Sequence, residues 1–177
     1  MKPITLIDNT QFELIINRLC YQLIENHIDF SNTVILGLQP RGVELATWIW
    51  KRLISITQDE EIKIGRLDVT FFRDDFRRRI EPINANSTKI DFIIEGKNVI
   101  LIDDVLYTGR TIRAGLDAML SYGRPKAVEL LVLIDRKFRR ELPIQAEYIG
   151  KSVDTYDNQK VKVVFGSKKN KVTLFTP

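Results

Sequence analysis

Short apolar runs alternate with segments of helical periodicity along the 177-residue chain, and this alternation restricts the fold more than any other feature. The runs Thr33–Leu38, Asn98–Ile102 and Ala127–Ile134 are almost continuously aliphatic, which is typical of strands covered on both faces. Apolar residues at helical spacing follow the first two runs, over Val43–Ile56 and Thr108–Tyr122. Strands that alternate with helices favour βαβ units and right-handed crossovers. The sequence therefore predicts an α/β fold with a central, mainly parallel sheet flanked by helices.

Shorter elements extend this scheme toward both ends of the chain. Asp8 and Gln11 have the spacing of a capping box, which indicates the start of a helix. The segment Ile62–Phe72 is rich in β-branched and aromatic residues and is predicted as a strand. Two more short strands are expected near the C-terminus, over Val161–Phe165 and Lys171–Phe175.

Composition excludes several kinds of chemistry. One cysteine, Cys20, and one histidine, His27, leave no intrachain disulfide, no Cys/His zinc cluster and no pair of histidines. His27 falls in an amphipathic segment, where a solvated or edge position is expected. No apolar run reaches the ~18–20 residues of a membrane span, and Asp8 interrupts the start, so neither a membrane segment nor a signal peptide is expected. The scarcity of cysteine favours the cytoplasm, and the net charge of +4 fits an anionic ligand or nucleic acid without requiring one.

The most informative string is Val99–Thr111, where four aliphatic residues lead into Asp103 and Asp104 and then into a short loop with Gly109. Two adjacent carboxylates at the end of a strand repel each other and lose solvation, so hydroxyl groups or a metal are expected to bind them. Thr108–Thr111 opens a helix, where free backbone N–H groups and the helix dipole favour a phosphate. Carboxylates that bind a diol beside a phosphate cup predict a site for a sugar phosphate.

Two other phosphate-binding motifs do not fit the sequence. Gly37–Gly42 has the GxxxxG spacing of a P-loop, but Val43 and Glu44 follow it where Lys and Ser or Thr are needed. The dinucleotide fingerprint GxGxxG does not occur in the sequence.

The arginine-rich stretch Arg73–Lys89 follows neither the helical nor the strand period. About 15 residues without structure are unusual inside a compact domain unless they are functional or disordered. A functional loop is therefore a candidate here.

Residues Val99–Thr111 resemble the phosphoribosyl-pyrophosphate (PRPP) motif of the type I phosphoribosyltransferases. More of the chain resembles one branch of that family, the pyrimidine operon attenuation regulators that are also uracil phosphoribosyltransferases. The stretches that carry this resemblance are Gly65–Asp75, Asp103–Gly115, Tyr122–Pro125, Asp135–Arg136, Glu141–Ile144 and Tyr148–Lys151. The resemblance as a whole covers roughly residues 4–155. The resemblance implies one domain over residues 1–177, with a flexible lid loop at about 73–89 and a small hood at about 135–177 together with the N-terminal segment.

The resemblance implies two loops that bind PRPP. Asp103 and Asp104 would bind the ribose 2′- and 3′-hydroxyls and contact Mg²⁺ through water, since PRPP supplies most of the metal's oxygen ligands. The phosphate loop, whose last four residues would cradle the 5′-phosphate, comprises Val105, Leu106, Tyr107, Thr108, Gly109, Arg110 and Thr111. The pyrophosphate loop comprises Gln39, Pro40, Arg41 and Gly42. Pro40 departs from the threonine common there, and it lacks an N–H to donate; a cis peptide bond is a family feature of this loop.

The lid residues Arg73, Asp74 and Asp75 would close over the reaction centre and exclude water. The resemblance makes Asp103, Asp104, Arg41 and Arg73 the expected catalytic residues, which would act through position and charge. It requires neither a nucleophilic side chain nor a strong base, which agrees with one histidine and one cysteine.

The identity of the base depends on two places. Purine-using members of the family carry an acid where Tyr107 stands, which argues against a purine. Uracil offers amide-like edges that the segment after the third strand would bind, namely Ile134, Asp135, Arg136 and Lys137. The predicted reaction converts uracil and PRPP to UMP and pyrophosphate; a transferase for hypoxanthine or guanine is the alternative.

The branch also implies a regulator that binds the leader mRNA of pyrimidine operons, as a homodimer or larger assembly that responds to UMP or UTP. Phosphate contacts from basic side chains would supply most of the RNA affinity. The candidates are Arg18, Arg139, Arg140 and Lys151. Tyr21 and Gln145 stand where basic or histidine residues are expected. A second alternative is a regulator that senses nucleotides without turnover.

Overall fold

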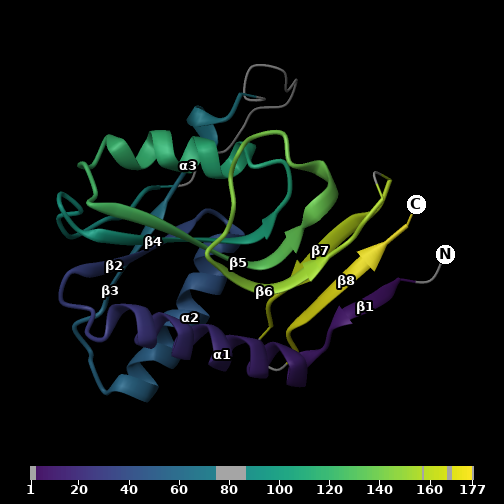
Figure 1. Ribbon diagram of the computed structural model, residues 1–177, viewed down its shortest axis with the longest axis horizontal. Helices are drawn as coiled ribbons and strands as arrows, with labels where there is room; N and C mark the ends of the chain where they lie inside the picture. Colours follow the sequence, from purple (N-terminus) through teal and green to yellow (C-terminus); the bar gives the residue numbers. More distant parts are fainter. Residues whose placement is uncertain (1–2, 75–86, 157, 167–168, 177) are drawn as a thin grey trace.

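A five-stranded parallel sheet forms the centre of the computed structural model, which describes residues 3–74, 87–156, 158–166 and 169–176 (Figure 1). Adjacent strands are parallel throughout, in the order β3-β2-β4-β5-β6. The strands are β2 (Thr33–Leu38), β3 (Lys63–Leu67), β4 (Asn98–Leu106), β5 (Ala127–Arg136) and β6 (Tyr148–Val153). The predicted α/β fold with a parallel sheet is confirmed.

Helices cover both faces of this sheet, with α1 (Asn9–His27) and α2 (Arg41–Thr57) on one face and α3 (Arg110–Leu120) on the other (Figure 1). Successive residues of a strand point to opposite faces. Ile100 and Ile102 of β4 accordingly join the core cluster that contains the apolar residues of α1 and α2. Val99 and Leu101 join the cluster that contains those of α3.

A second, antiparallel sheet joins the two ends of the chain. It consists of β1 (Ile4–Ile7), β7 (Lys160–Val164) and β8 (Lys171–Phe175), with β8 in the middle. Ile7, Val163 and Val172 pack into the same core cluster as Phe12 of α1. This sheet belongs to the segments predicted to form the hood, whose role as a cover stays a prediction.

Two predicted strand ends are wrong, and both errors lie beside the site. Over Ile62–Phe72 the strand stops at Leu67, and the 3₁₀ turn η1 (Thr70–Phe72) follows. The Asp68 side chain accepts hydrogen bonds from the backbone N–H and the hydroxyl of Thr70, which stabilises a turn in place of a ladder. By contrast, β4 continues past Ile102 to Leu106, because β5 pairs with it over this whole length. Asp103 and Asp104 therefore lie within the strand.

The start of α1 agrees with the prediction from the sequence, whereas the environment of its last residue, His27, does not. Asp8 and Gln11 form the predicted capping box. The expectation of a solvated or edge position for His27 is wrong, since its side chain is only 4% exposed. Nε2 lies 3.0 Å from a carboxylate oxygen of Glu129, and Nδ1 lies 3.1 Å from the hydroxyl of Thr33. The last turn of α1 lies near the first residues of β2 and β5, and the side chains of Thr33 and Glu129 in these strands bind the imidazole of His27.

Among the described residues, every helix is too short or too polar to cross a membrane.

The two core clusters allow a test of the fold. Leu131 of β5 is fully buried among the residues that pack on α1 and α2, whereas Leu120 at the end of α3 is 59% exposed. We expect Leu131→Ala to lower the free energy of unfolding by about 2–5 kcal/mol, because it leaves a cavity. Leu120→Ala, the matched control, should change it by less than about 0.5 kcal/mol. Urea denaturation measures both; equal effects would contradict the core described here.

Candidate active site

The polar residues singled out in the sequence meet at the carboxyl ends of β2, β4 and β5, where ligands bind in open parallel sheets. A cavity of about 210 Å³ opens there. It is lined by the phosphate loop (Val105–Thr111) together with Asp103, Arg73, Asp74 and Ile112. The structure thus brings the phosphate loop, the acidic pair and the start of the predicted lid together.

Asp103 and Asp104 are buried at this edge, each 8% exposed. The backbone N–H of Asp104 donates to Oδ1 of Asp103 at 2.9 Å, which orders the first carboxylate. Oδ2 of Asp104 lies 3.7 Å from Nη1 of Arg41, too far for a hydrogen bond. Among the described residues, this buried oxygen has no hydrogen-bond partner.

The surroundings of the pair penalise its charge. Burial raises the pKa of Asp103, and the neighbouring charge of Asp104 raises it further. Burial also raises the pKa of Asp104, although the charge of Arg41 opposes this effect. A ligand that donates hydrogen bonds or carries positive charge would relieve the penalty.

The unpartnered oxygen of Asp104 is the observation that tests the predicted ligands. A ribose hydroxyl or a metal-bound water would each supply the donor that this carboxylate lacks. No group of three or more Asp, Glu, His or Cys side chains within the described ranges could hold a metal by itself. The residues present therefore fit Mg²⁺ whose ligands come mainly from a phosphate ester and water.

The phosphate loop ends at the first turn of α3. Gly109 precedes this helix with φ +93° and has no side chain to cap it. The N–H of Arg110 makes only a long contact, 3.4 Å, to the hydroxyl of Thr108, so the first turn can still direct its backbone N–H groups to an anion. A Cβ on Gly109 would also come within 3.3 Å of Ile144. Glycine is therefore favoured here by the backbone conformation, and the space beside it is tight.

The pyrophosphate loop, Gln39–Gly42, lies against the acidic pair. The Gln39–Pro40 peptide bond is cis. A Cβ on Gly42 would lie 2.4 Å from the carbonyl oxygen of Ile102 and 3.1 Å from Cα of Asp103. This close approach of α2 to β4 places Arg41 beside Asp104. Nε2 of Gln39 donates to the carbonyl oxygen of Ser87 at 2.6 Å.

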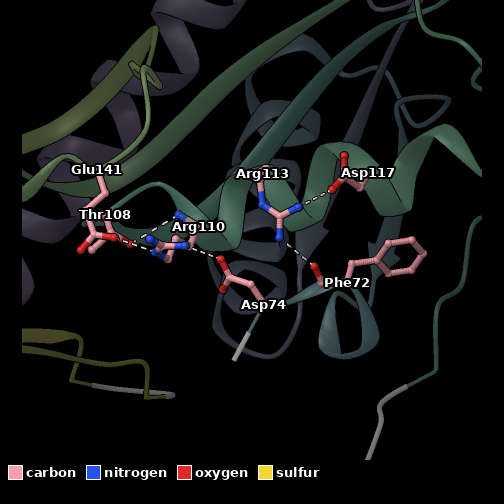
Figure 2. Close-up of polar contacts among 7 residues, drawn as sticks. All are labelled: Phe72, Asp74, Thr108, Arg110, Arg113, Asp117 and Glu141. Atoms are coloured by element: carbon pink, nitrogen blue, oxygen red, sulfur yellow. Dashed lines mark hydrogen bonds and ion pairs between the residues drawn. The ribbon is translucent and has the colours of Figure 1, made fainter. Parts of the chain in front are cut away.

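Arginines on α3 connect the phosphate loop to the segment that precedes the lid (Figure 2). The Arg110 guanidinium forms ion pairs with Asp74 and, at 2.6 Å, with Glu141. Arg113 pairs with Asp117 at 2.8 Å and donates to the carbonyl oxygen of Phe72 at 3.1 Å. The beginning of the predicted lid is thereby held against α3. Asp75 and the rest of that loop up to residue 86 lie outside the described residues.

The predicted base-binding segment ends β5 in a mostly buried environment. Ile134 is buried in the core, within a strand that is paired on both sides, whereas Lys137 is exposed. The Arg136 guanidinium stacks on the ring of Tyr107 at 3.9 Å and donates to the hydroxyl of Thr155 at 2.9 Å.

Thr155 and two other residues of this site were not foreseen. Gln159 accepts a hydrogen bond from Arg136 through its backbone carbonyl at 3.0 Å, and Glu141 pairs with Arg110. Glu141 lies in a stretch that carries the resemblance, but no motif in the sequence gives any of these three positions a role in the site, because they reach it only through the path of the chain after β5.

The four candidate RNA contacts fall in two places. Near β6, Arg18 donates to the carbonyl oxygen of Gly150 at 2.7 Å, and Lys151 donates to that of Leu6 at 2.9 Å, with both side chains on the surface. After β5, Arg139 is exposed, whereas Arg140 turns inward and pairs with Asp135.

A buried acidic pair lies beside the first turn of a helix at the end of a parallel strand, an arrangement that suits an anionic sugar ester. Residues 5–170 match the family model described as the phosphoribosyl transferase domain. The chain belongs to the phosphoribosyltransferase family.

Its relatives specify the branch. The chain is 44% identical over 158 residues to the bifunctional protein PyrR of Haemophilus ducreyi, a match that covers 89% of this chain and 87% of that protein. It is 42% identical over 159 residues to the bifunctional protein PyrR of Caldicellulosiruptor bescii, covering 90% and 86%. The predicted family, branch and enzyme class are confirmed.

Solved structures agree on the fold. A hypoxanthine-guanine phosphoribosyltransferase from Bacillus anthracis aligns with a TM-score of 0.65 at 23% identity, covering 85% of this chain and 82% of that one. A hypoxanthine phosphoribosyl transferase from Trypanosoma cruzi aligns with a TM-score of 0.68 at 14% identity, covering 85% and 78%.

The buried acidic pair predicts that two substitutions stabilise the protein. A folded-state pKa raised above the ordinary value near 3.9 means that the charged form destabilises the fold at neutral pH. Asp103→Asn and Asp104→Asn should therefore each raise the melting temperature at pH 7, by about 2–4 °C if each gains about 1 kcal/mol.

This gain should shrink as the pH falls through the folded-state pKa, since the wild-type carboxyl groups are then neutral as well. Asp117→Asn is the matched control, because Asp117 is 49% exposed and pairs only with Arg113 among the described residues. Thermal melts at several pH values measure the effect; variants that melt below the wild type at pH 7 would contradict it.

Proposed function

We propose that this protein transfers the 5-phosphoribosyl group of PRPP to uracil and also regulates pyrimidine genes by binding RNA. The observation that carries the first part is the buried oxygen of Asp104, which has no hydrogen-bond partner among the described residues, near the N-terminus of α3. A phosphoribosyl group offers a diol and a phosphate at the spacing of one sugar, which suits both features. Membership in the family and similarity to the PyrR proteins support the same assignment.

Different residues of the site bind different parts of the substrates. Asp103 and Asp104 bind the ribose hydroxyls, and the phosphate loop binds the 5′-phosphate with its backbone N–H groups and the hydroxyls of Thr108 and Thr111. Arg41 and Arg73 lie beside the acidic pair and bind the pyrophosphate. The backbone around Asp135 and Arg136 binds the base.

The reaction moves one bond at ribose C1. The C–O bond to pyrophosphate breaks, N1 of uracil forms the new bond, and the N1 proton is released to solvent. Positive charge develops on the ribose in the transition state, as in glycoside hydrolysis. The carboxylates of Asp103 and Asp104 stabilise this charge at close range in a site of low dielectric constant. Mg²⁺ bound to PRPP would supply positive charge at the leaving group.

Uracil is favoured over a purine by the residues around the base. Tyr107 stands where purine-using members of the family carry an acidic residue that exchanges a proton with the purine ring. The ring of Tyr107 is covered by the guanidinium of Arg136. The solved structures of purine phosphoribosyltransferases reported above resemble this chain at 23% identity or less and support the fold alone. Transfer to hypoxanthine or guanine is the competing assignment.

Regulation of pyrimidine genes is the second part of the proposal. The relatives named as bifunctional support it, as does the net charge of +4. Arg18 and Lys151 near β6, together with Arg139, are the surface candidates for contacts to leader mRNA. We place the protein in the cytoplasm as a homodimer or larger assembly, with UMP and UTP as ligands that report pyrimidine supply.

A panel of free bases tests the transferase. With PRPP and Mg²⁺, we expect pyrophosphate release and UMP formation with uracil, and none with hypoxanthine or guanine. Asp103→Asn and Asp104→Asn should each reduce kcat/KM by about 100-fold or more, because they remove charge that stabilises the transition state. Release with purines alone would contradict the assignment to uracil, and no release with any base would favour a nucleotide-sensing regulator.

A titration at two salt concentrations tests the RNA part. Leader transcripts of pyrimidine operons should bind tightly at low salt and more weakly at high salt, since phosphate contacts release counterions. The double variant Arg18→Met/Lys151→Met should lower the salt slope by about 2, roughly one for each lost contact. Arg124→Met removes one charge from an exposed arginine in the turn before β5 and is the control. Binding without sequence preference at low salt would reject the role.

A further inference from the structure

In the segment that follows β5, the side chain of Arg140 points back into the site. η3 (Lys137–Arg139) turns the chain at the end of the strand, and Arg140 comes next. Its guanidinium donates to the carbonyl oxygen of Tyr107 in the phosphate loop and pairs with the carboxylate of Asp135. The side chains of Arg140 and Asp135 are only 21% and 12% exposed. Arg140 therefore connects the phosphate loop to the end of β5.

The backbone after Arg140 supports the same loop. The N–H groups of Glu141 and Leu142 donate to the carbonyl oxygen of Thr108 at 3.0 and 3.2 Å. Leu142 and Ile144 also pack closely on Gly109. Residues 140–144, named here the strap, thus lie against the phosphate loop at Thr108 and Gly109.

Tyr107 is held on two sides as a result. Its carbonyl oxygen accepts from Arg140, and its ring lies under the guanidinium of Arg136. Both arginines come from the end of β5 and the turn after it. The β4–β5 ladder ends at Leu106 and Asp135. Beyond that point, two cationic side chains that bind protein groups connect the phosphate loop to this strand end.

We propose that Arg140 is a positioning residue for phosphoribosyl transfer, which holds the phosphate loop and the base-binding end of β5 at a fixed separation. The inference rests on the proposed function. Arg140 does not touch the reacting atoms. It keeps the ribose, anchored through its 5′-phosphate, in line with a base anchored near Asp135. A buried role of this kind also removes Arg140 from the surface contacts to RNA.

The geometry of the guanidinium explains why arginine stands here. Its planar fork donates in two directions at once, to a carbonyl on one side and a carboxylate on the other, whereas a lysine ammonium is a single compact group. Loss of the link would leave the N–H groups of α3 in place, so PRPP would still bind. The base would no longer face C1 correctly, and small misplacements of reacting groups are costly.

The test compares a ligand that binds only the phosphate end of the site with a ligand that binds both the phosphate end and the base-binding end. PRPP with Mg²⁺ is anchored by the phosphate loop and the acidic pair, whereas UMP also occupies the base-binding end. We expect Arg140→Met to lower kcat/KM for uracil roughly 10- to 100-fold. It should weaken UMP binding in calorimetry about tenfold and change PRPP affinity less than about threefold.

Arg140→Lys keeps a cation near Asp135 and should recover part of the loss, which also guards against a variant that fails to fold. Arg124→Met, in the turn before the amino end of β5, should behave as the wild type, because the site lies at the carboxyl ends of the strands. Melting curves establish that each variant is folded.

Three outcomes would overturn the inference. A folded Arg140→Met with wild-type kcat/KM and wild-type UMP affinity would do so, as would equal losses of PRPP and UMP affinity. Loss of RNA binding with transfer intact would assign Arg140 to RNA instead. These outcomes can be told apart from a failure of the proposed function, in which the wild type itself makes no UMP from uracil. The comparison of PRPP and UMP binding needs no turnover, so it still tests whether Arg140 positions the two ends of the site.

Discussion

Two adjacent carboxylates buried at the end of β4 are the constraint around which this site is arranged. Burial of Asp103 and Asp104 is unfavourable, since their pKa values are raised and one oxygen lacks a partner among the described residues. Neighbouring elements adapt to the pair. Gly42 lets the start of α2 approach the backbone of β4, and this approach brings Arg41 to 3.7 Å from Asp104. Natural proteins retain such unfavourable groups where function needs them.

The remainder of the site is organised by arginines that bind the protein itself. Arg110 joins the phosphate loop to Asp74 and Glu141, Arg136 covers Tyr107, and Arg140 links Tyr107 to Asp135. The exposed ion pairs of Arg110 contribute little to stability, because solvent screens them. Their geometric effect is larger, because they connect the lid side, the strap and the phosphate loop around one cavity.

Much of the fold could be predicted because its signals are local. The all-apolar strand Thr33–Leu38, the helical spacing over Val43–Ile56 and the capping box at Asp8 each follow from neighbouring residues, and the structure bears them out. The errors arise where distant elements decide. β4 runs on to Leu106 because β5 pairs with it, and His27 is buried because Thr33 and Glu129 bind its ring.

The sequence by itself determined the class of fold, the phosphoribosyltransferase motif and the order of loops that meet at the sheet's edge. Periodicity and a strand that runs into two aspartates are contained in consecutive residues. Only the tertiary structure decided that Asp104 keeps an unpartnered oxygen and that Arg140 faces inward. It also decided that Thr155 and Gln159 hold Arg136. These relations join residues far apart along the chain, so burial and hydrogen bonding between them exist only once the sheet has formed.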